Sequence, residues 1–68
     1  MNNVDTIMNF VAKSGGAAAI DVDVILGIPR ADATKILKKL HRDGLLDVQR
    51  VGKRNVYHIK PTAQTHNP

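Results

Sequence analysis

The chain has 68 residues, of which 43% are hydrophobic and 24% charged, a balance that fits one small globular domain and leaves no room for a second one. The absence of cysteine excludes disulfides, thiolate zinc sites and iron–sulfur clusters, and no apolar run approaches the length of about 18 residues that spans a membrane. The net charge of +4 is unevenly placed, because residues 30–68 hold nine of the ten basic residues. We therefore expect one surface to face a polyanion, the alternative being a solvated basic surface.

Apolar spacing predicts a first helix over residues 4–12. Its stripe recurs at i, i+3, i+4 and i+7 and consists of Val4, Ile7, Met8 and Val11. Asn3 is the expected N-cap, and Gly15 and Gly16 are expected to end the helix. Phe10 lies off the stripe, so both a core-edge and an exposed position stay open for it.

Residues 17–27 fit two patterns. Apolar and polar residues alternate over its first part, as in a strand, but Val22, Ile25 and Leu26 also share one helical face. We favour a short helix capped by Asp21, with Ile20 and Ile25 in contact as a hydrophobic staple. Gly27 is then the residue that ends it.

Residues 29–43 form the clearest predicted element, a basic amphipathic helix. Pro29 is expected at its first helical position and Gly44 just beyond its end. The apolar stripe consists of Ala33, Ile36, Leu37 and Leu40. The opposite side carries Ala31, Lys35, Lys38 and Arg42, with Thr34 on its flank.

Residues 46–51 and 55–59 read as a β-hairpin with a turn over residues 52–55. Basic side chains crowd its tip, namely Arg50, Lys53 and Arg54. Tyr57 and Ile59 alternate onto one face and are expected in the core. Residues 60–68 lack periodicity, so we expect one domain over residues 1–60 and a flexible tail over residues 61–68.

The order of elements predicts an α+β fold of three helices followed by a two-stranded β-hairpin. Two helices joined by a tight turn containing Gly27 are typical of a helix-turn-helix. The major groove of DNA is wide enough for one helix, and a basic hairpin could reach the adjacent groove or backbone.

At this point the sequence resembles the winged helix-turn-helix transcription regulators. The resemblance is carried by Val22 to Arg30, Lys35 to Leu46 and Val51 to Ile59, and it covers about residues 4–60. It looks like the DNA-binding cores of the MarR, ArsR and IclR-type families, and it also looks like small stand-alone regulators such as PapI. One departure is that Ala17 to Ile20 and a valine-rich segment stand where the family's second helix usually starts with Ser or Thr.

The resemblance implies a double-stranded DNA-binding transcriptional regulator. Residues 29–43 would be the recognition helix in the major groove, and residues 46–59 the wing on the adjacent backbone or minor groove. The expected DNA-binding residues are Arg30, Ala31, Thr34, Lys35, Lys38, Lys39, Arg42, Arg50, Lys53 and Arg54. One such module contacts few bases, so a homodimer or a second regulatory protein would complete a specific site.

Two other readings stay open. The domain could be a protein-interaction adaptor that binds another regulator through residues 4–24, with Phe10 and Val24 exposed. RNA or single-stranded nucleic acid is disfavoured, because Phe10 and Tyr57 are the only aromatic residues other than histidine. No catalytic arrangement, metal site or cofactor motif is recognisable, so we expect a protein that is not an enzyme. We also expect the protein to be cytoplasmic and not to bind a membrane.

Overall fold

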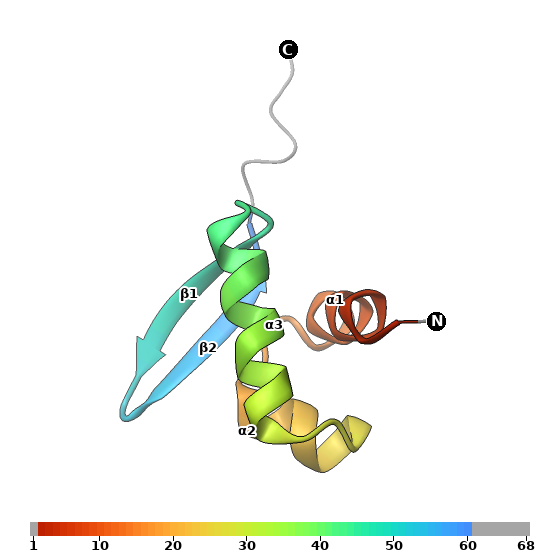
Figure 1. Cartoon of the computed structure of the whole chain (residues 1–68). Helices are drawn as coiled ribbons and strands as arrows, with labels where there is room; N and C mark the ends of the chain where they lie inside the picture. The colour runs from red at the N-terminus through yellow and green to blue at the C-terminus, as the bar shows by residue number, and fades with distance from the viewer. Residues whose placement is uncertain (1, 61–68) are drawn as a thin grey trace.

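The structure, a computed structural model, describes residues 2–60, so the predicted tail over residues 61–68 lies outside the described residues. The described part is an α+β arrangement in which helices precede an antiparallel hairpin (Figure 1). Its elements are α1 (Asn3–Ser14), α2 (Ala19–Asp21), the π-helical segment η1 (Val22–Leu26), α3 (Arg30–Arg42), β1 (Leu46–Val51) and β2 (Arg54–Ile59). None of the helices within residues 2–60 is long and apolar enough to cross a membrane.

Helix α1 is longer than the predicted range and begins one residue earlier. The N-cap is Asn2 rather than Asn3, since the Asn2 Oδ1 accepts a hydrogen bond from the Asp5 backbone N–H at 2.9 Å. The helix ends where expected, at Gly15 in the left-handed conformation with φ of 75°. The predicted stripe is confirmed, with Ile7 and Val11 fully buried, and Phe10 is half-buried against the core.

The second helix is confirmed, but its details differ from the prediction. Asp21 is not the N-cap. It lies in the third helical position, where its carboxylate Oδ2 accepts the Ala18 backbone N–H at 2.9 Å. Ala18 holds the N-cap position and has no side-chain oxygen to bond the helix start. The predicted staple of Ile20 and Ile25 is wrong, because with Ala18 as the N-cap these residues do not hold the N′ and N4 positions, and Ile25 is 63% exposed on the π-helical η1.

Helix α3 crosses the hairpin and packs its predicted stripe inward. Ala33, Leu37 and Leu40 are buried, and Ile36 packs partly against the core. Pro29 is the N-cap and not the first helical residue, since its ψ of 140° is extended. Gly44 follows the helix with φ of 85°, and the next N–H, of Leu45, donates to the Leu40 carbonyl at 3.0 Å, which closes the helix end as predicted.

The hairpin is tighter than predicted. Val51 pairs with Arg54, so the connection is only Gly52-Lys53, and Asn55 belongs to β2 opposite Arg50. The φ of 63° at Gly52 is the positive value that a two-residue type II′ turn requires at its first central position. Tyr57 is buried in the core as expected, but Ile59 is 38% exposed because it lies at the open end of the hairpin.

An isolated β-bridge joins the loop after α1 to the hairpin. Ala17 and Tyr57 form an antiparallel bridge, each backbone N–H donating to the other's carbonyl at 2.8 Å. Gly16 makes this approach possible, because a Cβ at this position would lie 3.3 Å from Cγ1 of Val56. The bridge ties the loop after α1 to β2.

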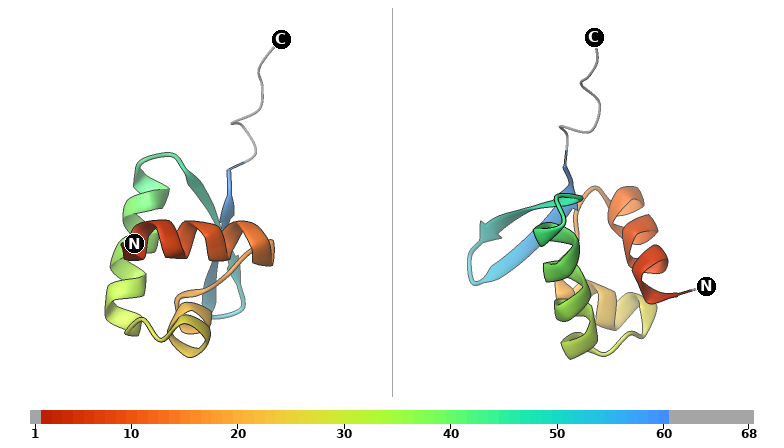
Figure 2. Two further views of the ribbon diagram at one scale, coloured as in Figure 1. Left: turned by 90° about the vertical axis from the view of Figure 1, so that its right-hand side faces the viewer. Right: turned by 45° about the horizontal axis from the view of Figure 1, so that its top comes forward.

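The core lies where α1, α3 and the base of the hairpin meet, and α1 and the hairpin tip extend to different sides of α3 (Figures 1 and 2). Its buried members come from α1, η1, α3, both strands and the connecting loops, and they are Ile7, Val11, Ala17, Val22, Ile28, Ala33, Leu37, Leu40, Leu46 and Tyr57. Because all but one are aliphatic or alanine, the helices and hairpin are positioned by apolar burial and close packing.

Candidate nucleic-acid interface

A groove between α3 and the hairpin collects basic side chains from two distant parts of the chain. We name it the basic groove, and its volume is about 400 Å³. Its described lining consists of Arg30, Thr34 and Lys38 from α3, Lys53, Arg54, Asn55 and Tyr57 from the hairpin, and Ala18, Ala19 and Ile20 from the start of the second helix. Four of these ten residues are cationic and none is acidic, so the groove favours an anion.

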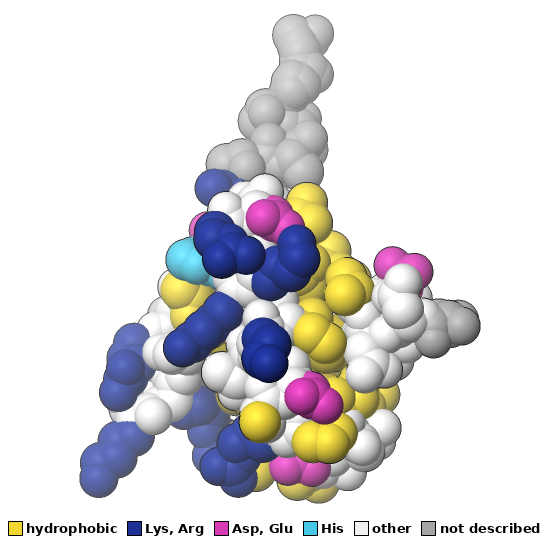
Figure 3. Space-filling model, viewed as in Figure 1, with side chains coloured by type: hydrophobic (Ala, Val, Ile, Leu, Met, Phe, Trp, Pro, Cys, Tyr) yellow, Lys and Arg dark blue, Asp and Glu magenta, His cyan; other side chains and the backbone are white. Residues whose placement is uncertain are grey.

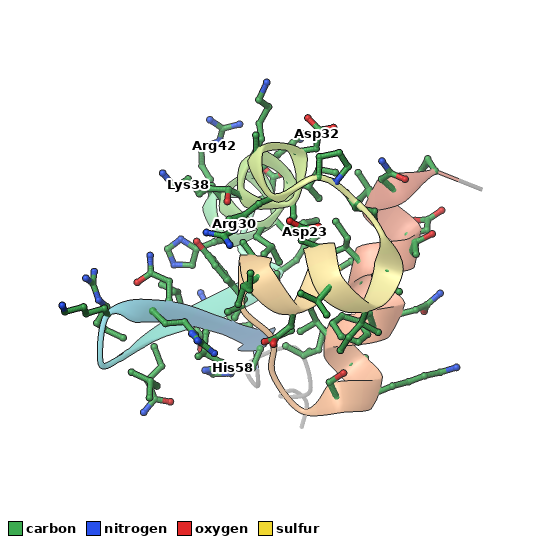
Figure 4. All side chains as sticks on the ribbon, turned by 90° about the horizontal axis from the view of Figure 1, so that it is seen from below. Asp23, Arg30, Asp32, Lys38, Arg42 and His58 are labelled. Atoms are coloured by element: carbon green, nitrogen blue, oxygen red, sulfur yellow. The ribbon has the colours of Figure 1, made fainter. Side chains whose placement is uncertain are left out.

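Helical spacing places the α3 members on the side of the hairpin. Arg30, Thr34 and Lys38 follow one another at four-residue intervals, so they share one face of the helix. That face is adjacent to the buried stripe because Leu37 and Leu40 hold the helix against the hairpin base. Figure 4 shows Lys38 leaving α3 on the side of the hairpin, whereas Asp32 leaves it on the other side.

The outer side of α3 continues the cationic surface. A second hollow, of about 500 Å³, lies along this helix alone and is lined by Lys35, Ile36, Lys38, Lys39 and Arg42. Figure 3 shows Lys and Arg side chains gathered over α3 and the hairpin, with apolar side chains along the side of α3 that faces α1. Lys38 lines both hollows and so joins them.

Two of the predicted cations are held by local partners. The Lys39 ammonium pairs with the Asp43 carboxylate, with 3.0 Å between Nζ and Oδ2, at an exposed site on the last turn of α3. The Arg50 Nε donates to the Gly52 carbonyl at 3.3 Å and thereby packs along the hairpin turn. Arg50 and Lys39 therefore contribute charge to the surface but lie outside the basic groove.

Tyr57 gives the basic groove a buried polar group. Its side chain is 5% exposed, and burial raises the pKa of its phenol above the ordinary value of 10.0. Within residues 2–60 its hydroxyl has no hydrogen-bond partner, and its ring meets that of His41 edge-on at 6.4 Å between centroids. Because Tyr57 lines the basic groove, its hydroxyl adds a hydrogen-bonding group to the lining.

The predicted site residues thus separate into three groups. The groove contains Arg30, Thr34, Lys38, Lys53 and Arg54, the outer side of α3 adds Ala31, Lys35, Lys39 and Arg42, and Arg50 lies beside the hairpin turn. Sequence reasoning missed Asn55 and Tyr57, which were assigned to the turn and to the core. A two-residue turn, recognisable only from the register, is what moves Asn55 onto the inner face of the hairpin.

The described residues contain no cluster of three or more His, Cys, Asp or Glu side chains that could hold a metal ion. His58 lies on β2 and His41 on α3, in separate elements. Comparison with protein-family models, curated proteins and solved structures found no match to this chain. The basic groove and α3 are therefore the features of this chain that bear on its function.

Proposed function

We propose that this chain is a winged-helix protein that binds double-stranded DNA and acts in transcription regulation. α3 would enter the major groove, and the β1–β2 hairpin would be the wing that reaches the adjacent backbone or minor groove. The observation that carries the proposal is the basic groove, in which cations from α3 and from the hairpin turn converge with no acidic side chain among the described lining. A basic surface that only contacts solvent does not require cations from two elements to converge in one groove. A DNA phosphate backbone that passes between the helix and the wing would be bound more tightly by such a cluster of cations.

The size and shape of α3 support this proposal. The helix has 13 residues, and its buried stripe fixes it to the domain while its outer side stays exposed. A helix held on one side and cationic on the other is the arrangement by which helix-turn-helix proteins place side chains against base edges. The second helix, ending at Gly27, would lie across the backbone beside it.

The test is the salt dependence of binding to a fluorescent random duplex of about 24 base pairs, measured by anisotropy from 50 to 200 mM salt. Neutralising about five to seven phosphates predicts a log–log slope of about −4.5 to −6.3, since each phosphate contributes about −0.9. Binding that is absent at 50 mM salt, or a slope near zero, would contradict DNA binding.

Variants that each remove one positive charge show which part of the protein contacts the DNA. Lys38→Gln or Lys53→Gln should make the slope less negative by about 0.9 each, because each lysine lines the basic groove. The matched control is Lys13→Gln, which removes the same charge from α1 and lines neither hollow. Equal effects of all three variants would indicate that only net charge matters and that α3 and the hairpin are not the interface.

A second candidate function is that of a protein-interaction adaptor. It is favoured by two adjacent apolar side chains on η1, since Val24 is 73% exposed and Ile25 is 63% exposed. Phe10, which the sequence also offered for this role, is half-buried against the core and supports it less. The test is capture of a partner by the tagged chain, with a Val24→Ser/Ile25→Ser double variant as the comparison. Loss of capture with unchanged DNA affinity would assign η1 to a protein partner.

A further inference from the structure

The part of α3 that would enter the major groove carries a restricted set of chemical groups. Its outward residues are Arg30, Ala31, Thr34, Lys35 and Lys38. Arg and Lys are hydrogen-bond donors only, Ala offers a methyl group, and Thr offers a methyl group with one hydroxyl. No Asn, Gln or Glu occurs anywhere in α3, and Asp32 leaves the helix on the side away from the hairpin (Figure 4).

Ion pairs and hydrogen bonds within the domain leave only some of the basic side chains of α3 free to contact bases. Within residues 2–60, Arg30, Lys35 and Lys38 make no ion pair and no side-chain hydrogen bond, whereas Lys39 is paired with Asp43. Side chains on the N-terminal part of a recognition helix are the ones that reach base edges. Lys39 and Arg42, on the last turn, are then left for phosphates.

The four bases differ in what they require of such a helix. In the major groove guanine presents two acceptors, N7 and O6, which suit the donors of Arg and Lys. Thymine presents a methyl group, which suits Ala and the Thr methyl. Adenine is best recognised by Asn or Gln, and cytosine by a carboxylate. The outward residues of α3 include no amide and no carboxylate side chain. The Thr34 hydroxyl both donates and accepts, so it does not choose between these edges.

We propose that α3 selects duplex DNA by a guanine- and thymine-bearing major-groove edge. Arg30 and Lys35 would donate to guanine N7 and O6, and Ala31 with Thr34 would contact a thymine methyl. Lys38, which lines the basic groove, would position the adjacent phosphate. This inference rests on the proposed function, because it assumes that α3 enters the major groove of double-stranded DNA.

The first experiment is selection of bound duplexes from a pool with about 20 randomised base pairs at physiological salt. The expected product is a short consensus that contains guanine and thymine on one strand. Random sequence after selection, with salt-dependent binding retained, would overturn the inference and leave the proposed function standing. Absence of salt-dependent binding to any duplex would instead remove the proposed function and the inference together.

Single-atom changes in the selected duplex then test the contacts. Replacing a consensus guanine by 7-deazaguanine removes the N7 acceptor and should weaken binding about 5- to 10-fold, part of the discrimination of a bidentate contact. Replacing a consensus thymine by deoxyuridine removes one methyl group and should weaken binding about 4-fold. The control is 7-deazaadenine at a site position, with a change of less than about 2-fold. Sensitivity to 7-deazaadenine that equals or exceeds sensitivity to 7-deazaguanine would overturn the inference.

A substitution that changes the preferred base shows which residue of α3 contacts that base. Lys35→Gln replaces a guanine-reading donor by a group that bonds adenine, so the preferred base should change from guanine to adenine at one position. The matched control is Lys39→Gln, which makes the same substitution in the same helix at the lysine paired with Asp43. It should weaken binding without changing the consensus. A consensus unchanged by Lys35→Gln, or changed equally by both variants, would contradict the assignment.

Discussion

Gly16→Ala tests whether the close approach of Gly16 and Ala17 to β2 contributes to the stability of this fold. Gly16 has φ of +147°, a value that residues with side chains rarely adopt, which costs about 1–3 kcal/mol. The added Cβ would also lie 3.3 Å from Cγ1 of Val56, and this crowding adds about 1 kcal/mol, the lower end of overpacking costs. The free energy of unfolding should therefore fall by about 2–4 kcal/mol.

The magnitude is large for a chain of this size. A domain of 68 residues is expected to have a free energy of unfolding of about 3–10 kcal/mol, so Gly16→Ala removes a major part of it. Urea denaturation followed by circular dichroism gives the value directly, and with a slope of about 1 kcal/mol per molar the midpoint should fall by about 2–4 M.

The matched control is Gly15→Ala, one residue earlier. Gly15 has φ of +75° and open space around its would-be Cβ, so the substitution should cost only about 1–2 kcal/mol, the penalty of the left-handed conformation. Equal losses in the two variants, within about 0.5 kcal/mol, would refute the close approach of the Gly16–Ala17 segment to β2.

Three further outcomes are expected. Ala18→Ser supplies the side-chain acceptor that the N-cap of α2 lacks and should raise the free energy of unfolding by about 1 kcal/mol, and an unchanged or lower thermal midpoint would contradict this. Leu37→Ala should lower that free energy by about 2–5 kcal/mol in urea titrations, because Leu37 is fully buried, and a loss below about 1 kcal/mol would place it outside the core. The raised pKa of Tyr57 means that the folded state holds the phenolic proton more tightly than the unfolded state does. The contribution of this proton to the free energy of unfolding is therefore complete below about pH 10 and is lost as the pH rises through the raised pKa. Tyr57→Phe should therefore lose less stability than the parent chain between about pH 8 and about pH 11, and parallel urea midpoints over this range would contradict the burial of the hydroxyl.

The elements that sequence alone predicted well are those whose cause is local. The apolar stripe of α3, with Ala33, Leu37 and Leu40 inward, follows from helical periodicity, and the glycines at positions 27 and 44 end their helices because they adopt positive φ without a steric penalty. The charge asymmetry also predicted that the basic residues would gather on α3 and the hairpin.

The details of the segment around the second helix could not be predicted, because they depend on partners distant in sequence. Ala17 is extended since its backbone pairs with Tyr57, 40 residues later, and no local pattern of residues 17–20 encodes that partner. Ile25 lies on the π-helical η1 and is exposed, whereas a regular α-helical pattern placed it inward.

The sequence by itself determined which residues are cationic, which helix carries them and where that helix begins and ends, because composition, periodicity and capping act within a few residues. Only the tertiary structure decided that Arg30, Lys38, Lys53 and Arg54 line one groove and that the buried Tyr57 lines it with them. Their convergence depends on the packing of α3 against the hairpin and on the register of a two-residue turn, which are set by burial of the shared core rather than by local preference.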